Sequence, residues 1–127
     1  MPLHVGRFDA LLREAGDQPD AQRLLFVFAA LGVPDSNGGA TSSLAPLRWF
    51  DKLPADMATF DALCSEAGPT TPAWDIVFVS SLAGKLASPP SAALTAAALQ
   101  HMVEQIRAGR ITTLVPFDRS GQPLFFA

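Results

Sequence analysis

The sequence predicts an α/β fold in a single domain, residues 1–127, with a four- to five-stranded mixed sheet and three helices in two layers or a sandwich. Amphipathic segments of helical period alternate with apolar runs of strand length. One segment also occurs twice: residues 8–16 read Phe-Asp-Ala-Leu-Leu-Arg-Glu-Ala-Gly, and residues 60–68 read Phe-Asp-Ala-Leu-Cys-Ser-Glu-Ala-Gly. The match continues without a gap to residues 32 and 84, with 11 of 25 positions identical. This repeat predicts a duplicated helix-strand-strand unit in two halves, about 4–53 and 56–127.

The first half begins with a helix over residues 4–16, because apolar residues recur there at three- and four-residue steps as far as a terminating glycine. Residues 23–31 form an almost unbroken apolar run, which is typical of a strand buried on both faces, although periodicity alone does not exclude a buried helix. Residues 33–43 are rich in glycine, serine and other breakers and predict a loop that is either a mobile connector or functional. Residues 44–53 predict a second strand, with Pro46 near its start, where proline is tolerated.

The second half repeats this order. Asp56 is the expected N-cap of a helix over residues 57–67, and residues 74–82 predict a strand that matches the first one, with Phe78 equivalent to Phe26. Both phenylalanines are expected in equivalent buried places.

The clearest helix spans residues 92–108, between an N-cap at Ser91 and a stop at Gly109. Residues 111–117 predict a fourth strand, and residues 118–126 predict a terminal hairpin. The order strand, helix, strand favours a right-handed parallel crossover. The apolar side of the helix is expected to consist of Leu94, Ala98, Leu99, Met102, Val103 and Ile106.

Composition and charge restrict the class of protein. Hydrophobic residues make up 49% of the chain, which is enough for an ordinary core, and the net charge is only −3. The nine lysines and arginines are scattered, so neither nucleic acid nor a membrane surface is the expected partner. A single cysteine excludes an intrachain disulfide and suits a reducing compartment. With neither a signal peptide nor a membrane span in the sequence, we expect a cytoplasmic protein.

The most suggestive candidate site follows the third strand. Ser80, Ser81, Gly84 and Lys85 combine two hydroxyls, a glycine and a cation, which could hold a phosphate or nucleotide beyond the carboxyl end of a strand. The phosphate-loop motif, however, needs an earlier glycine and a hydroxyl residue after the lysine, and here Leu86 follows the lysine. An ordinary strand-to-loop transition is therefore the favoured interpretation.

Two further segments resemble each other, Phe-Asp-Lys at residues 50–52 and Phe-Asp-Arg at residues 117–119. If a pseudo-two-fold axis relates the halves, Asp118 and Arg119 would lie in places equivalent to Asp51 and Lys52 and could frame a symmetric pocket. The alternative, which the turn preference of aspartate favours, is that each aspartate begins a turn.

The remaining reactive side chains indicate no metal site and no catalytic centre. His4 and His101 have no cluster of other ligands at metal-binding spacing. Cys64 lies on the expected buried face of a helix, and no local motif places a base beside it. We therefore expect neither a metal nor a cofactor.

Three segments carry a resemblance to a known family: Arg-Leu-Leu-Phe-Val-Phe at residues 23–28, Trp-Asp-Ile-Val-Phe-Val at 74–79 and Pro-Phe-Asp-Arg-Ser-Gly-Gln-Pro at 116–123. Over most of its length the chain resembles small proteobacterial proteins that are often labelled "ribonucleotide reductase subunit alpha". Such a reductase uses a radical cysteine and a redox cysteine pair, which a chain with one cysteine cannot supply. The resemblance therefore implies a common fold and no catalytic residues.

These observations favour a small cytoplasmic protein that is more readily an interaction or regulatory protein than an enzyme. Its expected partner is an unidentified protein, and a homodimer is compatible with this interpretation. The alternative is a small enzyme or ligand-binding domain that uses the segment from Ser80 to Lys85.

Overall fold

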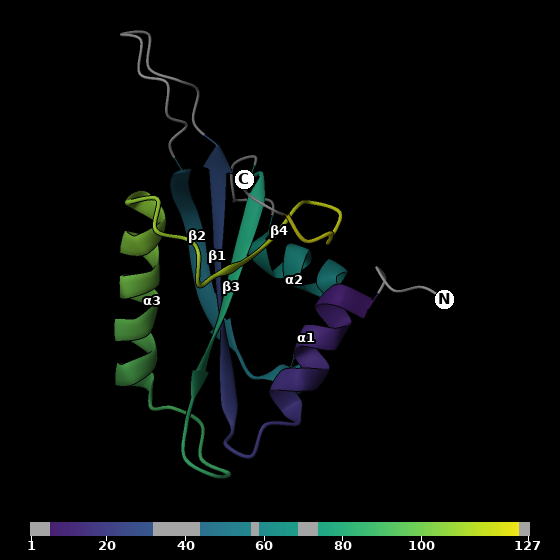
Figure 1. Cartoon of the computed structure of the whole chain (residues 1–127), viewed down its shortest axis with the longest axis vertical. Coiled ribbons are helices and arrows are strands. Elements are labelled where there is room, and N and C mark those ends of the chain that lie inside the picture. The colour runs from purple at the N-terminus through teal and green to yellow at the C-terminus, as the bar shows by residue number, and fades with distance from the viewer. Residues whose placement is uncertain (1–5, 32–43, 57–58, 69–73, 125–127) are drawn as a thin grey trace, which may run out of the picture.

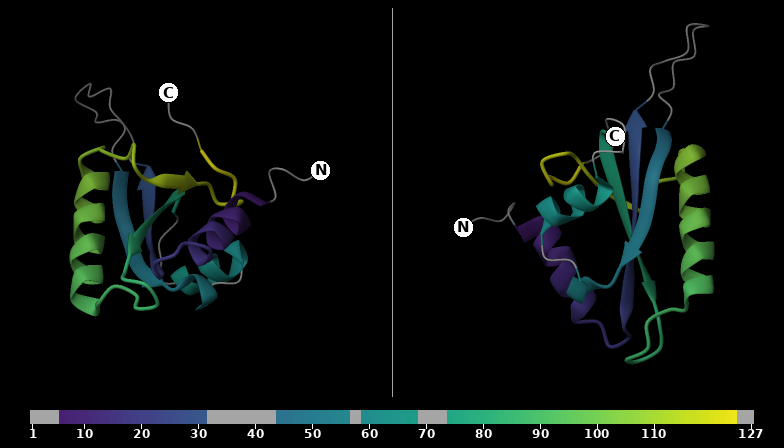
Figure 2. Two further views of the ribbon diagram at one scale, coloured as in Figure 1. Left: turned by 60° about the horizontal axis from the view of Figure 1, so that its bottom comes forward. Right: turned by 180° about the vertical axis from the view of Figure 1, so that it is seen from behind.

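The computed structural model describes residues 6–31, 44–56, 59–68 and 74–124. Within these ranges the chain forms three α-helices, a short 3₁₀ helix η1 (Pro54–Asp56) and a four-stranded sheet. Helix α3 (Ala92–Arg107) covers one face of the sheet, and α1 (Gly6–Gly16) and α2 (Phe60–Ala67) cover the other (Figures 1 and 2). The α/β prediction is confirmed, and of the two arrangements expected, two layers or a sandwich, the structure has a sandwich with the sheet between two layers of helix.

The sheet has the order β2-β1-β3-β4, and every pairing in it is antiparallel. Its strands are β1 (Gln22–Leu31), β2 (Leu44–Lys52), β3 (Ile76–Ala83) and β4 (Val115–Phe117). The expected mixed sheet and parallel crossover are therefore wrong. The reason lies in the connection after α3, which folds back beside the helix (Figure 1), with Ile111 and Leu114 packed in the core beneath it. Strand β4 consequently enters the sheet antiparallel to β3.

Strand β1 lies at the centre of the sheet and is buried on both faces, as its unbroken apolar sequence predicts. Alternate side chains enter two separate cores because successive residues of a strand point to opposite faces. Leu24, Phe26 and Phe28 pack toward α1 and α2. Leu25, Val27 and Ala29 pack toward α3.

The internal duplication is not confirmed. Each repeated segment does contain a helix followed by a strand, α1 with β1 and α2 with β3. However, Phe26 packs in the core beneath α1 and α2, whereas Phe78 packs in the core beneath α3. In the antiparallel register Phe26 lies opposite Val79, and Phe78 lies opposite Val27. The predicted equivalence of the two phenylalanines is wrong, because an offset of one residue moves a side chain to the other face of a sheet.

The start of α2 also differs from the prediction. Thr59, not Asp56, is the N-cap, and its hydroxyl oxygen accepts a hydrogen bond of 3.0 Å from the backbone N–H of Ala62. Asp56 ends the 3₁₀ helix that precedes this point. Threonine fills the same role as aspartate because both side chains offer an oxygen to the unpaired N–H groups of the first turn.

Helix α3 begins after Ser91, as predicted, and the Ser91 side chain accepts from the N–H of Leu94. Leu94 itself is 63% exposed, so its place in the apolar face is wrong. Thr95 is buried instead, because its hydroxyl donates to the carbonyl of Ser91 at 2.7 Å and so needs no water.

The fourth strand is confirmed only over Val115–Phe117. His4 and the loop expected at residues 33–43 lie outside the described residues.

Phe8 joins four elements in the core beneath α1 and α2. Its ring lies edge-to-face against Phe60 of α2 and Phe117 of β4, with centroids 5.3 and 5.5 Å apart. It also lies 6.5 Å from the ring of Phe26 in β1. These contacts fix the position of α1 over the sheet, because edge-to-face aromatic pairs add a geometric preference to the burial of their area.

Candidate functional site

Residues 80–83 of β3 leave one side of the sheet open. Strand β4 pairs only with Val77, Phe78 and Val79, whereas β1 pairs with β3 as far as Ala83. Among the residues that the structure describes, no strand lies on the outer side of residues 80–83. Such an edge presents backbone donors and acceptors that another strand can use.

The register shows which backbone groups point outward. Gly84 donates its N–H to the carbonyl of Ala21, across the β1 side, at 2.7 Å. Pro116 has no N–H and lies opposite Phe78, which places Val77 and Val79 in the positions that bond to β4. Because the direction alternates along a strand, the N–H and C=O of Ser81 and of Ala83 point to the open side.

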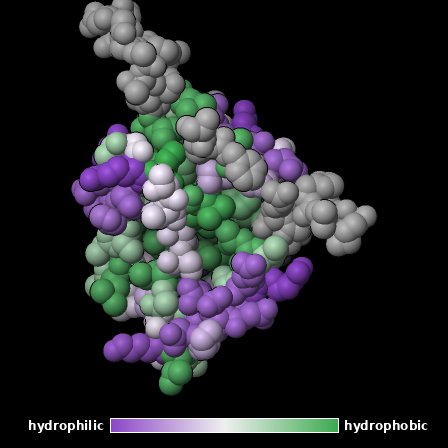
Figure 3. Space-filling model, viewed as in Figure 1, coloured by the Kyte–Doolittle hydropathy of each residue, from purple (hydrophilic) through white to green (hydrophobic). Residues whose placement is uncertain are grey.

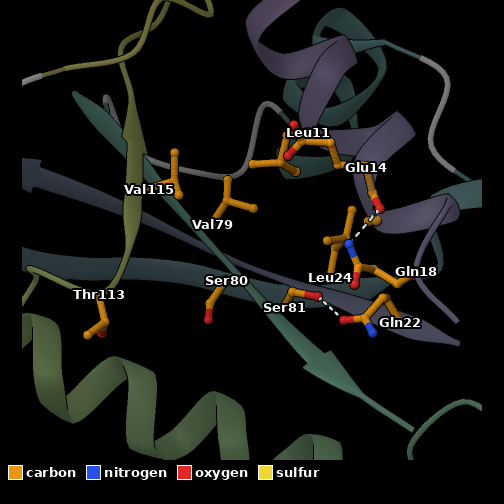
Figure 4. Close-up of a pocket in the computed structure, with 11 residues that line it drawn as sticks. Leu11, Glu14, Gln18, Gln22, Leu24, Val79, Ser80, Ser81, Thr113 and Val115 are labelled. Atoms are coloured by element: carbon orange, nitrogen blue, oxygen red, sulfur yellow. Dashed lines mark hydrogen bonds between the residues drawn. The ribbon is translucent and has the colours of Figure 1, made fainter. Parts of the chain in front are cut away.

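A groove of about 370 Å³ lies beside this edge, between α1 and the sheet (Figure 4). Its apolar part contains Leu24 and Val79, which are buried, and Val115, which is 40% exposed. The space-filling view shows hydrophobic residues in this region, beside the hydrophilic surface of α1 (Figure 3). The described lining residues are Leu11, Glu14, Ala15, Gln18, Gln22, Leu24, Val79, Ser80, Ser81, Thr113 and Val115.

The other part of the groove is polar. The hydroxyl of Ser81 donates to Oε1 of Gln22 at 2.5 Å, so Ser81 faces the α1 side of the sheet (Figure 4). Gln18 donates its side-chain N–H to the backbone carbonyl of Glu14 at 3.2 Å. Glu14 is the one charged residue among the described lining residues. The site therefore combines an apolar floor, two hydrogen-bonded glutamines and a carboxylate.

The structure separates the residues that the sequence grouped into an anion site. Ser80 and Ser81 line the groove, but they lie within β3 and not in a loop. Lys85 is exposed and belongs to a tight turn in which Lys85 and Ser88 exchange two backbone hydrogen bonds of 2.9 Å. Gly84 allows the close approach of this turn, because a Cβ there would overlap the carbonyl oxygen of Ser88. Gly84 therefore packs against Ser88 and Pro89 of this turn.

Asp118 and Arg119 lie at the other end of β3, since they follow Phe117, which pairs with Val77. Asp118 begins a turn: its Oδ1 accepts from the hydroxyl of Ser120 at 2.6 Å and from the N–H groups of Ser120 and Gln122. These bonds, the Ser120 hydroxyl first, lower the pKa of Asp118 below its ordinary value. Arg119 lies over the ring of Trp74, 5.8 Å from its centroid. Both side chains thus have structural partners.

The corresponding charges in β2 have different surroundings. Asp51 pairs with Arg23 at 2.8 Å, and Lys52 pairs with Glu66 of α2 at 2.8 Å. Asp51 therefore lies within a strand and begins no turn. The two Phe-Asp-Lys/Arg segments do not form a common pocket in the described residues.

A smaller cavity of about 190 Å³ lies beside Arg23, Asp51 and the first turn of α3. Arg23 bonds to the Asp51 carboxylate and, at 3.4 Å, to the carbonyl of Pro90. The carboxylate balances the guanidinium charge, so the pair joins β1, β2 and the segment before α3 without leaving a free cation for an anionic ligand.

Cys64 is partly buried against the core beneath α1 and α2. Burial raises the pKa of its thiol above the ordinary value, which disfavours the thiolate that a nucleophile needs. His101 is exposed on α3. In the described ranges, no three histidine, cysteine, aspartate or glutamate side chains gather as metal ligands.

Most of the groove could not be found from the sequence. Ser80 and Ser81 were recognisable as hydroxyls after an apolar run, but Glu14, Gln18 and Thr113 come from segments that the fold alone brings together.

No family model, curated protein or solved structure matches the chain. None of the described helices has the length and apolar character that crossing a membrane requires.

Proposed function

We propose that this chain is a small cytoplasmic, non-catalytic interaction protein that binds an extended segment of a partner protein along the open edge of β3. The observation that carries this proposal is the position of the open edge directly beside an amphipathic groove. A peptide that adds a strand to a sheet edge gains affinity from backbone hydrogen bonds and specificity from side chains in adjacent pockets.

The edge and the groove fit one ligand strand. Residues 80–83 offer a length of roughly 13 Å at about 3.3 Å per residue, with outward backbone groups at Ser81 and Ala83. Alternate residues of an added strand point to the α1 side, where Leu11 and Val79 supply apolar contact. The short edge suits a segment of four to six residues and a modest affinity.

The other edges of the sheet are less suitable. Strand β2 contains Pro46, which offers no N–H, and its register with β1 shifts between Phe28 and Ala29. Irregularities of this kind prevent edge-to-edge pairing. On β4, the outward carbonyl of Pro116 already accepts from the N–H of Leu124. Residues 80–83 of β3 carry neither a proline nor a bulge.

A phosphate or nucleotide ligand is the competing function. The two serines at the groove favour it, but the groove carries the carboxylate of Glu14, and Lys85 is not among its described lining residues. A carboxylate repels an anion. Phosphate or nucleotide binding is therefore kept as an alternative outcome of the experiment described next.

The test uses an unbiased library of ten-residue peptides displayed on phage and selected on the immobilised full chain. Affinities of enriched peptides are then measured by fluorescence anisotropy for the unchanged protein and for Ser81→Pro, which removes an outward N–H. The matched control is Ser81→Ala, which removes the hydroxyl and keeps the N–H. Circular dichroism and the melting temperature establish that both variants fold, and Ala83→Pro replaces Ser81→Pro if the latter does not.

We expect Ser81→Pro to weaken binding by about two- to tenfold, as the loss of a hydrogen bond worth roughly 0.5–1.5 kcal/mol implies, and Ser81→Ala to bind nearly normally. Failure to enrich any peptide, or equal binding by the folded proline variant, overturns the proposal. If phosphate esters raise the melting temperature and Lys85→Ala abolishes that rise, the phosphate function replaces it.

A further inference from the structure

We infer that the groove selects a lysine or arginine side chain in the bound segment, with the carboxylate of Glu14 as its partner. This inference rests on the proposed function and adds the chemistry of the ligand. It follows from the position of Glu14, from the register of an added strand and from the mixed character of the groove wall.

Glu14 offers a carboxylate with no partner in the part of the chain that the structure describes. The side chain is exposed, and its recorded contact, from Gln18, uses the backbone carbonyl and not the carboxylate. The described lining residues of the groove include no lysine, arginine or histidine. Glu14 also lies in the last turn of α1, where the unpaired carbonyls of a helix end add a partial negative charge. The groove therefore attracts a cation.

The register places one ligand side chain near this carboxylate. The Ser81 side chain lies on the α1 face of the sheet, because it bonds to Gln22 and shares the parity of Val79. In antiparallel pairing, residues directly opposite each other project their side chains to the same face. The ligand residue opposite Ser81 therefore projects into the groove that Glu14 borders. Its two neighbours project to the α3 face.

The wall of the groove also suits the shape of a lysine or arginine. Leu11 and Leu24 line the groove on the side of Glu14, and Val115 lies farther along it, beside Val79 (Figure 4). Long cationic side chains pack an apolar stem on such a surface and carry the charge to its rim. A purely apolar side chain would cover Glu14 without pairing it, and an acidic one would be repelled.

The experiment uses the peptides enriched on the full chain. In each, the lysine or arginine that enrichment fixes is replaced by norleucine, which keeps a stem without charge, or by glutamate. Affinities are measured by fluorescence anisotropy for the unchanged protein, for Glu14→Gln and for Glu14→Lys. The matched control is Glu104→Gln, an exposed glutamate on α3, on the opposite face of the sheet.

We expect the cationic peptide to bind about two- to fivefold more tightly than the norleucine peptide at low salt, as an exposed ion pair allows. Glu14→Gln removes this difference, Glu104→Gln keeps it, and Glu14→Lys reverses it in favour of the glutamate peptide. The preference also decreases as salt screens the pair.

The outcomes separate the two proposals. Enriched peptides without a fixed cation, or a cation preference that survives Glu14→Gln, overturn the role of Glu14 and leave strand addition standing. A selection that enriches no peptide overturns strand addition itself. A preference that Glu104→Gln also removes shows a general charge effect and overturns the inference.

Discussion

Gly84→Ala and Gly16→Ala are the same chemical change at two glycines, and the structure predicts opposite effects on the free energy of unfolding. At Gly84 a Cβ would overlap the carbonyl oxygen of Ser88 and would lie 2.8 and 2.9 Å from backbone atoms of Pro89. At Gly16, in α1, a Cβ meets nothing within 4 Å. The first change therefore forces the backbone to move, and the second does not.

The cost at Gly84 follows from the bonds that this movement disturbs. Lys85 and Ser88 exchange two backbone hydrogen bonds of 2.9 Å across the turn, and the rigid Pro89 limits how the chain can yield. Losing both bonds costs about 1–3 kcal/mol at roughly 0.5–1.5 kcal/mol each. For a chain of this length that corresponds to a melting temperature lower by about 4–12 °C. Gly16→Ala should stabilise by up to about 1 kcal/mol, because alanine restricts the unfolded chain.

Urea unfolding followed by far-ultraviolet circular dichroism measures both values on proteins of equal purity. Lys85→Ala serves as a third variant, since the exposed Lys85 side chain should contribute almost nothing to stability. A Gly84→Ala protein as stable as the unchanged chain would refute the steric argument and would return Gly84 to the candidate ligand residues.

Three further predictions concern other parts of the fold. The pKa of Asp118 is lowered in the folded state, first by the hydroxyl of Ser120. Its stabilisation is therefore complete above the unfolded value of 3.8 and is lost as the pH falls through the folded pKa. Asp118→Asn should therefore reduce the pH dependence of the free energy of unfolding, measured by urea titration, by a few tenths of a kcal/mol. Leu99→Ala should cost about 2–5 kcal/mol and Leu94→Ala almost nothing, because Leu99 is 8% exposed and Leu94 63%; equal costs would contradict the placement of α3. Alkylation of Cys64 should have its pH midpoint above 9.0, since burial raises the thiol pKa.

The elements of this fold could be predicted from local patterns, whereas their directions could not. The unbroken apolar run predicted β1 as a strand buried on both faces, and the structure confirms it, although periodicity alone left a buried helix open. A hydrophobic pattern does not indicate whether β4 is parallel or antiparallel to β3. The answer depends on the connection that folds back beneath α3, where Leu114 is buried and Ile111 is partly buried. The same apolar residues are the reason that the sequence predicted a strand over the whole of residues 111–117.

The limits on the candidate site have a different cause. Local signals found Ser80 and Ser81, because hydroxyls after an apolar run are conspicuous, and they grouped Gly84 with the candidate anion-binding residues. The structure packs Gly84 against Ser88. The acid that gives the groove its charge, Glu14, had no such signal. Glu14 lies on α1, and tertiary packing determines the distance between α1 and β3. A single sequence does not show that distance directly.

The aromatic junction at Phe8 connects the integrity of the groove to the local unfolding of α1. The ring holds α1 against α2, β1 and β4, and α1 supplies one wall of the groove. Whenever the helix opens, that wall is lost, so a ligand that needs the wall binds only the closed form. By thermodynamic linkage, a bound segment must then slow hydrogen exchange at the amides of α1 by the factor 1 + [L]/Kd. Exchange at this helix therefore reports groove occupancy without a label on either partner.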